Sequence, residues 1–99
     1  MAVQGETREK TRIDIREPKH YRVIMHNDDF TSMDFVVEIL VDIFHKDEIE
    51  ASRLMLMVHE SGRAVVGSYP YDIAVTKVKA AQARAKEAGF PFRLTVEEN

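Results

Sequence analysis

The hydrophobic pattern of this chain changes its period within residues 21–44, and this change restricts the folds that the chain can adopt. Residues 21–26 alternate with the two-residue period of a strand whose two faces meet different neighbours. From Met33 onward the apolar residues lie three or four positions apart, which predicts an amphipathic helix. Thr31 with Asp34 resembles a capping box with a short acid, so we expect Thr31 to cap this helix. One strand face contains Tyr21, Val23 and Met25, the other contains Arg22, Ile24 and His26, and the helical stripe contains Met33, Val36, Val37, Leu40 and Phe44.

A second helix and a second strand are expected in the middle of the chain. Asp47, with Glu50 three residues later, is an N-cap signal, and Gly62 is suited to end the helix in a left-handed conformation. Residues 63–69 form a short segment with β-branched side chains at its centre, which predicts a strand that ends before Pro70. The inner stripe of this helix consists of Ala51, Leu54, Met55 and Val58.

The last third of the chain predicts a third helix and a third strand. Asp72 is expected to cap the helix, and Gly89 is expected to end it. Residues 92–97 alternate apolar and polar side chains, which predicts a strand with one buried face. The inner stripe of the helix consists of mostly small residues that allow close packing: Ala74, Val78, Ala81, Ala85 and Ala88.

The element order β-α-α-β-α-β predicts a small α+β fold with a three-stranded antiparallel sheet and helices packed on one face. Ninety-nine residues suffice for one domain, which we place at residues 20–99. Residues 1–19 contain many charged and few apolar side chains, so we expect them to form a flexible N-terminal tail.

The composition argues against several classes of protein. The chain has 14 basic and 17 acidic residues, a net charge of -3 and no basic block, which argues against binding nucleic acid or an anionic membrane. It contains no cysteine, so disulfides, thiolate nucleophiles and sulfur-bound zinc are excluded. No apolar run approaches the roughly 20 residues of a membrane span, and the polar start is unlike a signal peptide. We therefore expect a cytoplasmic protein.

Motifs for catalysis and metal binding are missing or incomplete. The four histidines form neither H-E-x-x-H nor a pair four residues apart, so a zinc hydrolase would lack its ligands. A calcium loop counted from Asn27 has Ser32 at the position that requires glycine. Asp28 and Asp29 are not accompanied by a glycine-rich loop or a cationic cluster that would hold a phosphate. We therefore expect no metal site and no cofactor, and an enzyme that uses Asp28 and Asp29 with a metal stays only as a remote alternative.

Asn27, Asp28 and Asp29 form a cluster of hydrogen-bond acceptors between the first strand and the first helix. With a neutral imidazole beside them they would suit a primary ammonium group, which offers three donors and a positive charge. Short polar residues also build turns and cap helices, and residue chemistry alone favours that simpler role. His59 is either such an imidazole or a histidine favoured by the dipole at a helix C-terminus. Three methionines are either core residues or the lining of a pocket: Met33, Met55 and Met57.

Three motifs resemble those of the ClpS family, adaptor proteins that deliver N-end-rule substrates to the ClpA-type AAA+ unfoldase of the ClpAP protease. The family pattern V-N-D-D-Y/F-T-P-M-E/D-F-V appears here as residues 26–36, and L-M-L-x-V-H appears as residues 54–59. A later pattern, G-x-Y/F-x-x-E/D-x-A-x-T-K, appears as residues 67–77. The resemblance extends from Tyr21 to about Glu97 and leaves the N-terminal segment unmatched.

The resemblance implies a non-enzymatic, monomeric adaptor for N-degron substrates, which begin with a free amine and a bulky first residue, Leu, Phe, Tyr or Trp. It implies docking to the N-terminal domain of the unfoldase, and it implies that Met33 excludes β-branched first residues. The alternative is a modulator that docks on the unfoldase and inhibits or redirects it without binding N-degrons. The positions that match the family assign the binding of the amine to Asn27, Asp28, Asp29 and His59. They assign the lining of the hydrophobic pocket to Thr31, Met33, Val36, Met55, Val58 and Phe92. They assign docking on the unfoldase to Asp72 and Lys77.

Three residues depart from the family pattern. Ser32 replaces proline at the first helical position and is expected to loosen the first turn of the helix. Val75 replaces a common glutamate and is expected to weaken the acidic part of the docking surface. Phe92 replaces leucine, and its larger ring is expected to narrow the pocket. Together these departures imply an altered preference for the first residue rather than a loss of binding.

Overall fold

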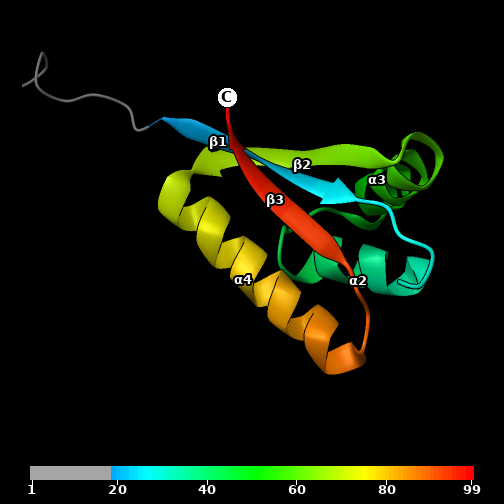
Figure 1. The fold of residues 1–99 in the computed structure, drawn as a ribbon. Helices are drawn as coiled ribbons and strands as arrows, with labels where there is room; N and C mark the ends of the chain where they lie inside the picture. The colour runs from blue at the N-terminus through cyan, green and yellow to red at the C-terminus, as the bar shows by residue number, and fades with distance from the viewer. Residues whose placement is uncertain (1–18) are drawn as a thin grey trace, which may run out of the picture.

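The computed structural model describes residues 19–99, and it confirms the order β-α-α-β-α-β (Figure 1). All but one residue of the expected flexible tail, residues 1–19, lies outside the described residues. The elements are β1 (His20–His26), α2 (Met33–Asp42), α3 (Glu48–Ser61), β2 (Arg63–Pro70), α4 (Tyr71–Ala88) and β3 (Arg93–Glu98).

The three strands form one antiparallel sheet in the order β2-β1-β3, so the first strand of the chain is the central one. Figure 1 shows α4 running across one face of the sheet, with α2 on the same side and α3 near the start of β2. Contacts agree with this view, because α4 touches all three strands, α3 touches β2, and α2 packs on α3. The expected packing of the helices on one face of the sheet is confirmed.

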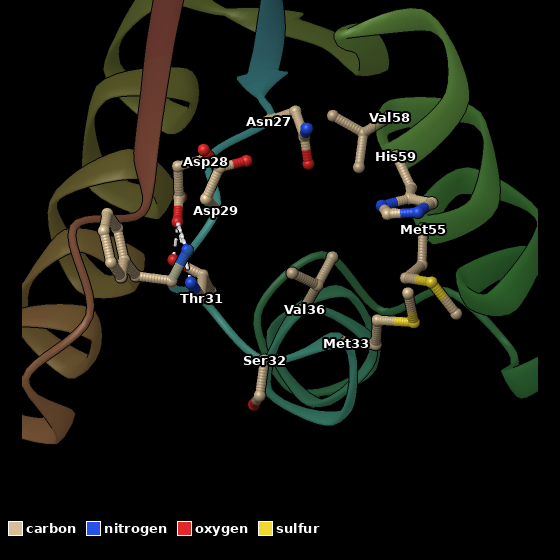
Figure 2. A pocket seen from close by; sticks show the side chains of 11 residues that line it. Asn27, Asp28, Asp29, Thr31, Ser32, Met33, Val36, Met55, Val58 and His59 are labelled. Atoms are coloured by element: carbon tan, nitrogen blue, oxygen red, sulfur yellow. Dashed lines mark hydrogen bonds between the residues drawn. The ribbon is translucent and has the colours of Figure 1, made fainter.

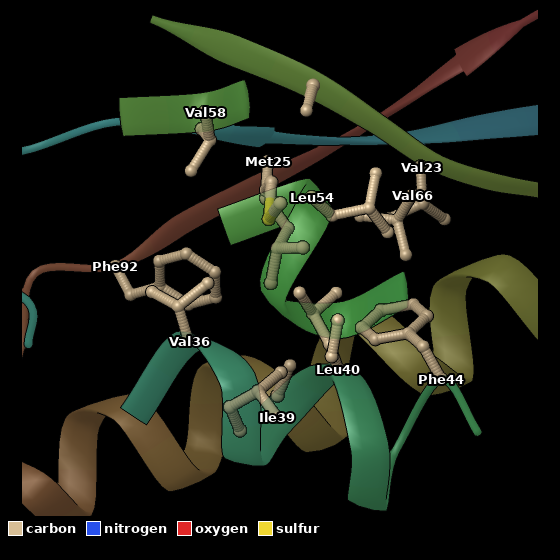
Figure 3. Packing of buried hydrophobic residues seen from close by; sticks show 14 of the residues in the cluster. Val23, Met25, Val36, Ile39, Leu40, Phe44, Leu54, Val58, Val66 and Phe92 are labelled. Atoms are coloured by element: carbon tan, nitrogen blue, oxygen red, sulfur yellow. The ribbon is translucent and has the colours of Figure 1, made fainter. Parts of the chain in front are cut away.

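One hydrophobic core fills the space between the sheet and the helices (Figure 3). Val23 and Met25 of β1 meet Ile39 and Leu40 of α2 there, and all four side chains are fully buried. Small side chains on α4 let this helix lie close to the sheet, as its alanine-rich stripe predicted. The buried residues of α4 are Ala74, Ala81 and Ala85.

Three predicted helix ends are confirmed. The Asp47 carboxylate caps α3 by accepting a hydrogen bond from the backbone amide of Glu50 at 2.7 Å. Gly62 ends α3 and Gly89 ends α4, with φ angles of 88° and 82°. Both angles lie in the left-handed region, which side chains with a Cβ atom disfavour.

The predicted cap of α4 is wrong. This helix begins at Tyr71 directly after Pro70, and no side chain caps it. Asp72 lies inside the first turn, where its negative charge interacts favourably with the helix dipole. Three members of the predicted stripes also differ, because Phe44 is buried beyond the end of α2 and both Met33 and Ala88 are exposed.

One apolar side chain is buried on the sheet face that points away from the helices. The alternating pattern had placed this residue on a face that also contains polar residues. Ile24 is fully buried, although it lies outside the main core that contains Val23 and Met25. An ion pair of 3.8 Å joins Arg63 of β2 to Glu97 of β3 and therefore spans β1, the strand between them. This ion pair therefore lies across the strand that contains Ile24, and an arginine in such a place can cover apolar surface with its methylene stem.

This face also contains a histidine with a lowered pKa. His26 Nε2 lies 2.8 Å from the Thr95 hydroxyl, and burial, then the charges of Arg93 and Arg63, lower the pKa below its ordinary value of 6.5, against an opposing effect of Glu97. The unfolded chain then binds a proton more readily than the folded protein, so the free energy of unfolding decreases as the pH falls below about 6.5.

We expect His26→Gln, which keeps a neutral hydrogen-bonding side chain, to reduce the acid sensitivity of the fold. The midpoint of thermal unfolding should fall less between about pH 7 and pH 5 in this variant than in the natural chain. Circular dichroism melts at both pH values measure the difference. Equal decreases in the two proteins would contradict a role for His26 in this pH dependence.

Candidate functional site

A cavity of about 360 Å³ opens where the segment between β1 and α2 faces α3 (Figure 2). Every residue that the sequence assigned to ligand binding lines this cavity, except Phe92. Phe30 and Ser32 also line it and were missed, although both lie within the motif at residues 26–36. The lining consists of Asn27, Asp28, Asp29, Phe30, Thr31, Ser32, Met33, Val36, Met55, Val58 and His59.

Asp28 holds the loop that leads into α2. Its Oδ1 accepts hydrogen bonds from the backbone amides of Phe30 at 2.8 Å and Thr31 at 2.7 Å, and its Oδ2 accepts one from the Thr31 hydroxyl at 2.7 Å. Burial by itself raises the pKa of Asp28, but these hydrogen bonds outweigh burial and hold the pKa below its ordinary value. The turn-forming role proposed for the acceptor cluster therefore applies to Asp28, which places a stable negative charge at the cavity.

Ser32, rather than Thr31, caps α2. The Ser32 hydroxyl accepts a hydrogen bond from the Phe35 backbone amide at 3.2 Å, whereas the Thr31 hydroxyl is bound to Asp28. The prediction that Thr31 caps the helix is wrong, and Ser32 lies at the cap position rather than at the first helical position. Serine occupies the cap position, where a side-chain acceptor stabilises a helix by about 1 kcal/mol.

Asn27 and His59 come from separate elements and face each other across the cavity. The backbone amide of Asn27 donates a hydrogen bond to the carbonyl of Gly62 at 2.9 Å, which joins the end of β1 to the end of α3. Figure 2 shows the Asn27 carboxamide oxygen pointing into the cavity and the His59 ring opposite it. Within residues 19–99, the side chains of Asn27 and Asp29 form no hydrogen bond, so their oxygens remain available to a ligand.

Apolar side chains form the other end of the cavity. Val36 of α2 and Val58 of α3 are 6% and 3% exposed and provide a firm wall. Met33 and Met55 line the cavity from the same two helices and point toward each other in Figure 2. Met33 is 46% exposed and is therefore no core residue, and Met57 is 37% exposed and lines no part of this cavity.

A smaller cavity of about 20 Å³ adjoins the main one and contains the remaining predicted pocket residue, Phe92. Both cavities are lined by Val36 and Val58 of the apolar end and by Asn27, Asp28 and Thr31, so the smaller one adjoins both ends of the main cavity. His26 also lines it and was not predicted. Its full lining is His26, Asn27, Asp28, Thr31, Val36, Val58 and Phe92.

The two residues assigned to docking lie on α4, and neither lines the cavity. Asp72 is exposed. Lys77 is partly buried, because its Nζ donates a hydrogen bond to the Ile43 carbonyl at 2.8 Å and lies over the rings of Phe44 and Tyr69. Lys77 therefore also ties α4 to the segment that follows α2.

The main cavity can bind a molecule with a donor-rich cation at one end and an apolar group at the other. Within residues 19–99, no group of three or more His, Asp or Glu side chains is placed to hold a metal ion. None of the helices in the described part of the chain has both the length and the apolar character needed to cross a membrane.

Known proteins resemble this chain over nearly its whole length. The family model described as ATP-dependent Clp protease adaptor protein ClpS matches residues 16–95. The ATP-dependent Clp protease adapter protein ClpS of Wolinella succinogenes is 50% identical over 93 residues, which cover 94% of this chain and 91% of that protein. The corresponding protein of Acetivibrio thermocellus is 48% identical over 97 residues, 98% of both chains.

A solved structure is similar as well. The structure of Agrobacterium tumefaciens ClpS2 bound to L-phenylalaninamide superposes with a TM-score of 0.81 at 42% sequence identity. The match covers 84% of this chain and 100% of that one. The chain therefore belongs to the ClpS family of adaptor proteins for the ATP-dependent Clp protease, and it is an adaptor rather than an enzyme.

Proposed function

We propose that this adaptor binds the free N-terminal amine and the bulky hydrophobic first residue of N-degron substrates, and delivers them to a ClpA-type AAA+ unfoldase. The observation that carries the proposal is a single cavity with polar acceptors at one end and valine and methionine side chains at the other. The first residue of such a substrate has the same two parts, an ammonium group and an apolar side chain.

The acceptor end suits the ammonium group in charge and in hydrogen bonding. Asn27, Asp29 and His59 offer acceptors from three directions, which match the three N–H donors of the amine. Asp28 contributes its negative charge while its oxygens hold the loop, so we assign it an electrostatic role.

The apolar end suits the first side chain. The ClpS2 protein of known structure is bound to L-phenylalaninamide, a molecule with a free amine and a benzyl group, and this supports the assignment. We assign Leu, Phe, Tyr and Trp to this end as first residues. The exposed position of Met33 on the rim supports a role in excluding β-branched first residues. The pocket residues are Thr31, Met33, Val36, Met55 and Val58, with Phe92 at the inner end.

A fluorescence-anisotropy titration tests this function. The probe is a labelled peptide that begins with Phe, prepared once with a free amine and once with an acetylated amine. The free peptide should bind and the acetylated peptide should not. Equal affinities would show that the cavity does not recognise the amine.

We further propose that the adaptor acts as a monomer that docks on the N-terminal domain of the unfoldase through the start of α4. Asp72 is exposed there between Tyr71 and Ile73, which are 55% and 46% exposed, and such a mixture of charge and apolar surface suits a protein interface. An ATP-dependent protease works where ATP is available, so we place this activity in the cytoplasm.

Asp72→Lys is expected to weaken binding to the unfoldase N-terminal domain by about tenfold, because reversing an interfacial charge creates repulsion. Its affinity for a Phe-initiated peptide should not change. Glu87→Lys, with the same charge change at an exposed site near the other end of α4, is the control. Biolayer interferometry measures the affinity of each variant for the unfoldase N-terminal domain and for the peptide. Unchanged unfoldase binding in Asp72→Lys would contradict docking at this site, and unfoldase binding without any peptide binding would favour a modulator.

A further inference from the structure

Phe92 and His26 line the inner cavity of the proposed pocket but not the main cavity. The inner cavity of about 20 Å³ has room for about one water-sized group. It shares five of its lining residues with the main cavity, and Phe92 is among those that it adds. Phe92 is only 3% exposed, so its ring forms a wall rather than a mobile surface group.

A side chain of α4 holds the backbone on which this wall is built. The pairing of β1 with β3 ends at His26 and Arg93, so Phe92 lies one residue beyond the sheet. Gln82 replaces the missing strand partner, because its Nε2 donates a hydrogen bond to the Phe92 carbonyl. Its Oε1 accepts a second hydrogen bond from the Leu94 backbone amide at 3.0 Å. One carboxamide thus fixes the chain on both sides of Arg93.

Aromatic contacts also hold the Phe92 ring. The Phe35 ring meets it edge-on with centroids 6.1 Å apart, and Phe90 packs on Phe35 at 5.0 Å. These contacts fix the orientation of the ring, and the two hydrogen bonds from the planar amide fix the backbone from which the ring projects.

We propose that Gln82 is a positioning residue that sets the depth of the first-residue pocket by holding Phe92, and that this depth favours Phe over Trp. The proposal rests on the proposed N-degron function. A Trp side chain extends beyond a Phe side chain by more than one water-sized group, which is all that the inner cavity accommodates. Misfits of this size in apolar pockets change affinity by about tenfold or more.

The test uses labelled peptides that differ only in the first residue, Phe or Trp, together with an acetylated Phe peptide. The natural chain should bind the Phe peptide about tenfold more tightly than the Trp peptide. Phe92→Leu replaces the ring with a shorter side chain. Gln82→Met removes both hydrogen bonds and keeps a side chain of similar size. Each variant should reduce the Phe-to-Trp ratio to about threefold or less. Gln82→Glu keeps the acceptor for Leu94 but not the donor to Phe92, and it should give an intermediate ratio. Lys79→Met, an exposed site on the same helix, is the matched control and should keep the ratio.

The Phe-to-Trp ratio separates positioning from a general loss of structure, because partial unfolding lowers both affinities equally. A ratio near one in the natural chain, or an unchanged ratio in both Gln82→Met and Gln82→Glu, would overturn the proposal. A changed ratio in Phe92→Leu alone would show that Phe92 limits the pocket without help from Gln82, and this result would likewise overturn the proposal. If Gln82→Met does not fold, Gln82→Glu decides. Equal binding of free and acetylated Phe peptides would instead refute the underlying function, whatever the ratio.

Discussion

Acetylation of the amine of a Phe-initiated peptide is expected to lower its affinity for this adaptor by about 100-fold or more. The change removes the positive charge and two of the three N–H donors but leaves the benzyl group intact. The acceptors of Asn27, Asp29 and His59 would then lose water without gaining a donor. Each unsatisfied acceptor costs about 1–3 kcal/mol, so two of them already account for a loss of this size.

His59→Ala is expected to reduce the affinity for the free-amine peptide by about tenfold or more. A hydrogen bond to a charged group contributes about 1.5–3 kcal/mol, and the lost ring also opens that side of the cavity to water. Glu60→Ala is the matched control, because Glu60 follows in the same helix, is exposed and does not line the cavity. Anisotropy titrations of both variants measure the effect. Similar losses in the two variants would show that His59 acts through the helix and not as an acceptor.

Leu40→Ala is expected to lower the free energy of unfolding by about 3 kcal/mol. Leu40 is fully buried in the core beside Ile39 and Met25, so the smaller side chain leaves a cavity that its neighbours fill only in part. Domains of this size are stable by about 5–15 kcal/mol, so this single change removes a large part of the stability.

Urea unfolding followed by circular dichroism measures this loss. The matched control is Leu56→Ala, the same substitution at a residue of α3 that is 49% exposed. It should change the free energy of unfolding by only about 0.5 kcal/mol. Losses of similar size at both positions would contradict the view that the core between α2 and the sheet holds this fold together.

Local sequence patterns predicted most of the fold. The caps at Asp47 and Gly62 depend on a few neighbouring residues, and both form as expected. The two errors in capping arose where neighbours compete. Thr31 is bound by Asp28 and leaves the cap to Ser32, and Pro70 starts α4 before Asp72 can cap it. Local propensity does not reveal which of several suitable side chains takes a given backbone amide.

Residue chemistry alone left the role of the acceptor cluster open. Asp28 does form the turn, as the simpler interpretation held, while the side chains of Asn27 and Asp29 form no hydrogen bond with the rest of residues 19–99. The motifs shared with the ClpS family pointed to the same residues and to His59, and the structure brings all of them to one cavity. Phe30 and Ser32 lie in the same motif and could have been included on that signal.

The elements, their order and the family could be predicted from the sequence, because they follow from periodicity, caps and motifs within short stretches of chain. Only the tertiary structure placed Asn27 opposite His59, joined Arg63 to Glu97 across β1, and brought Gln82 to the backbone at Phe92. Each of these contacts joins residues far apart in the chain. Such contacts form only when the packing of the whole core fixes the distances between elements, and no local pattern records that packing.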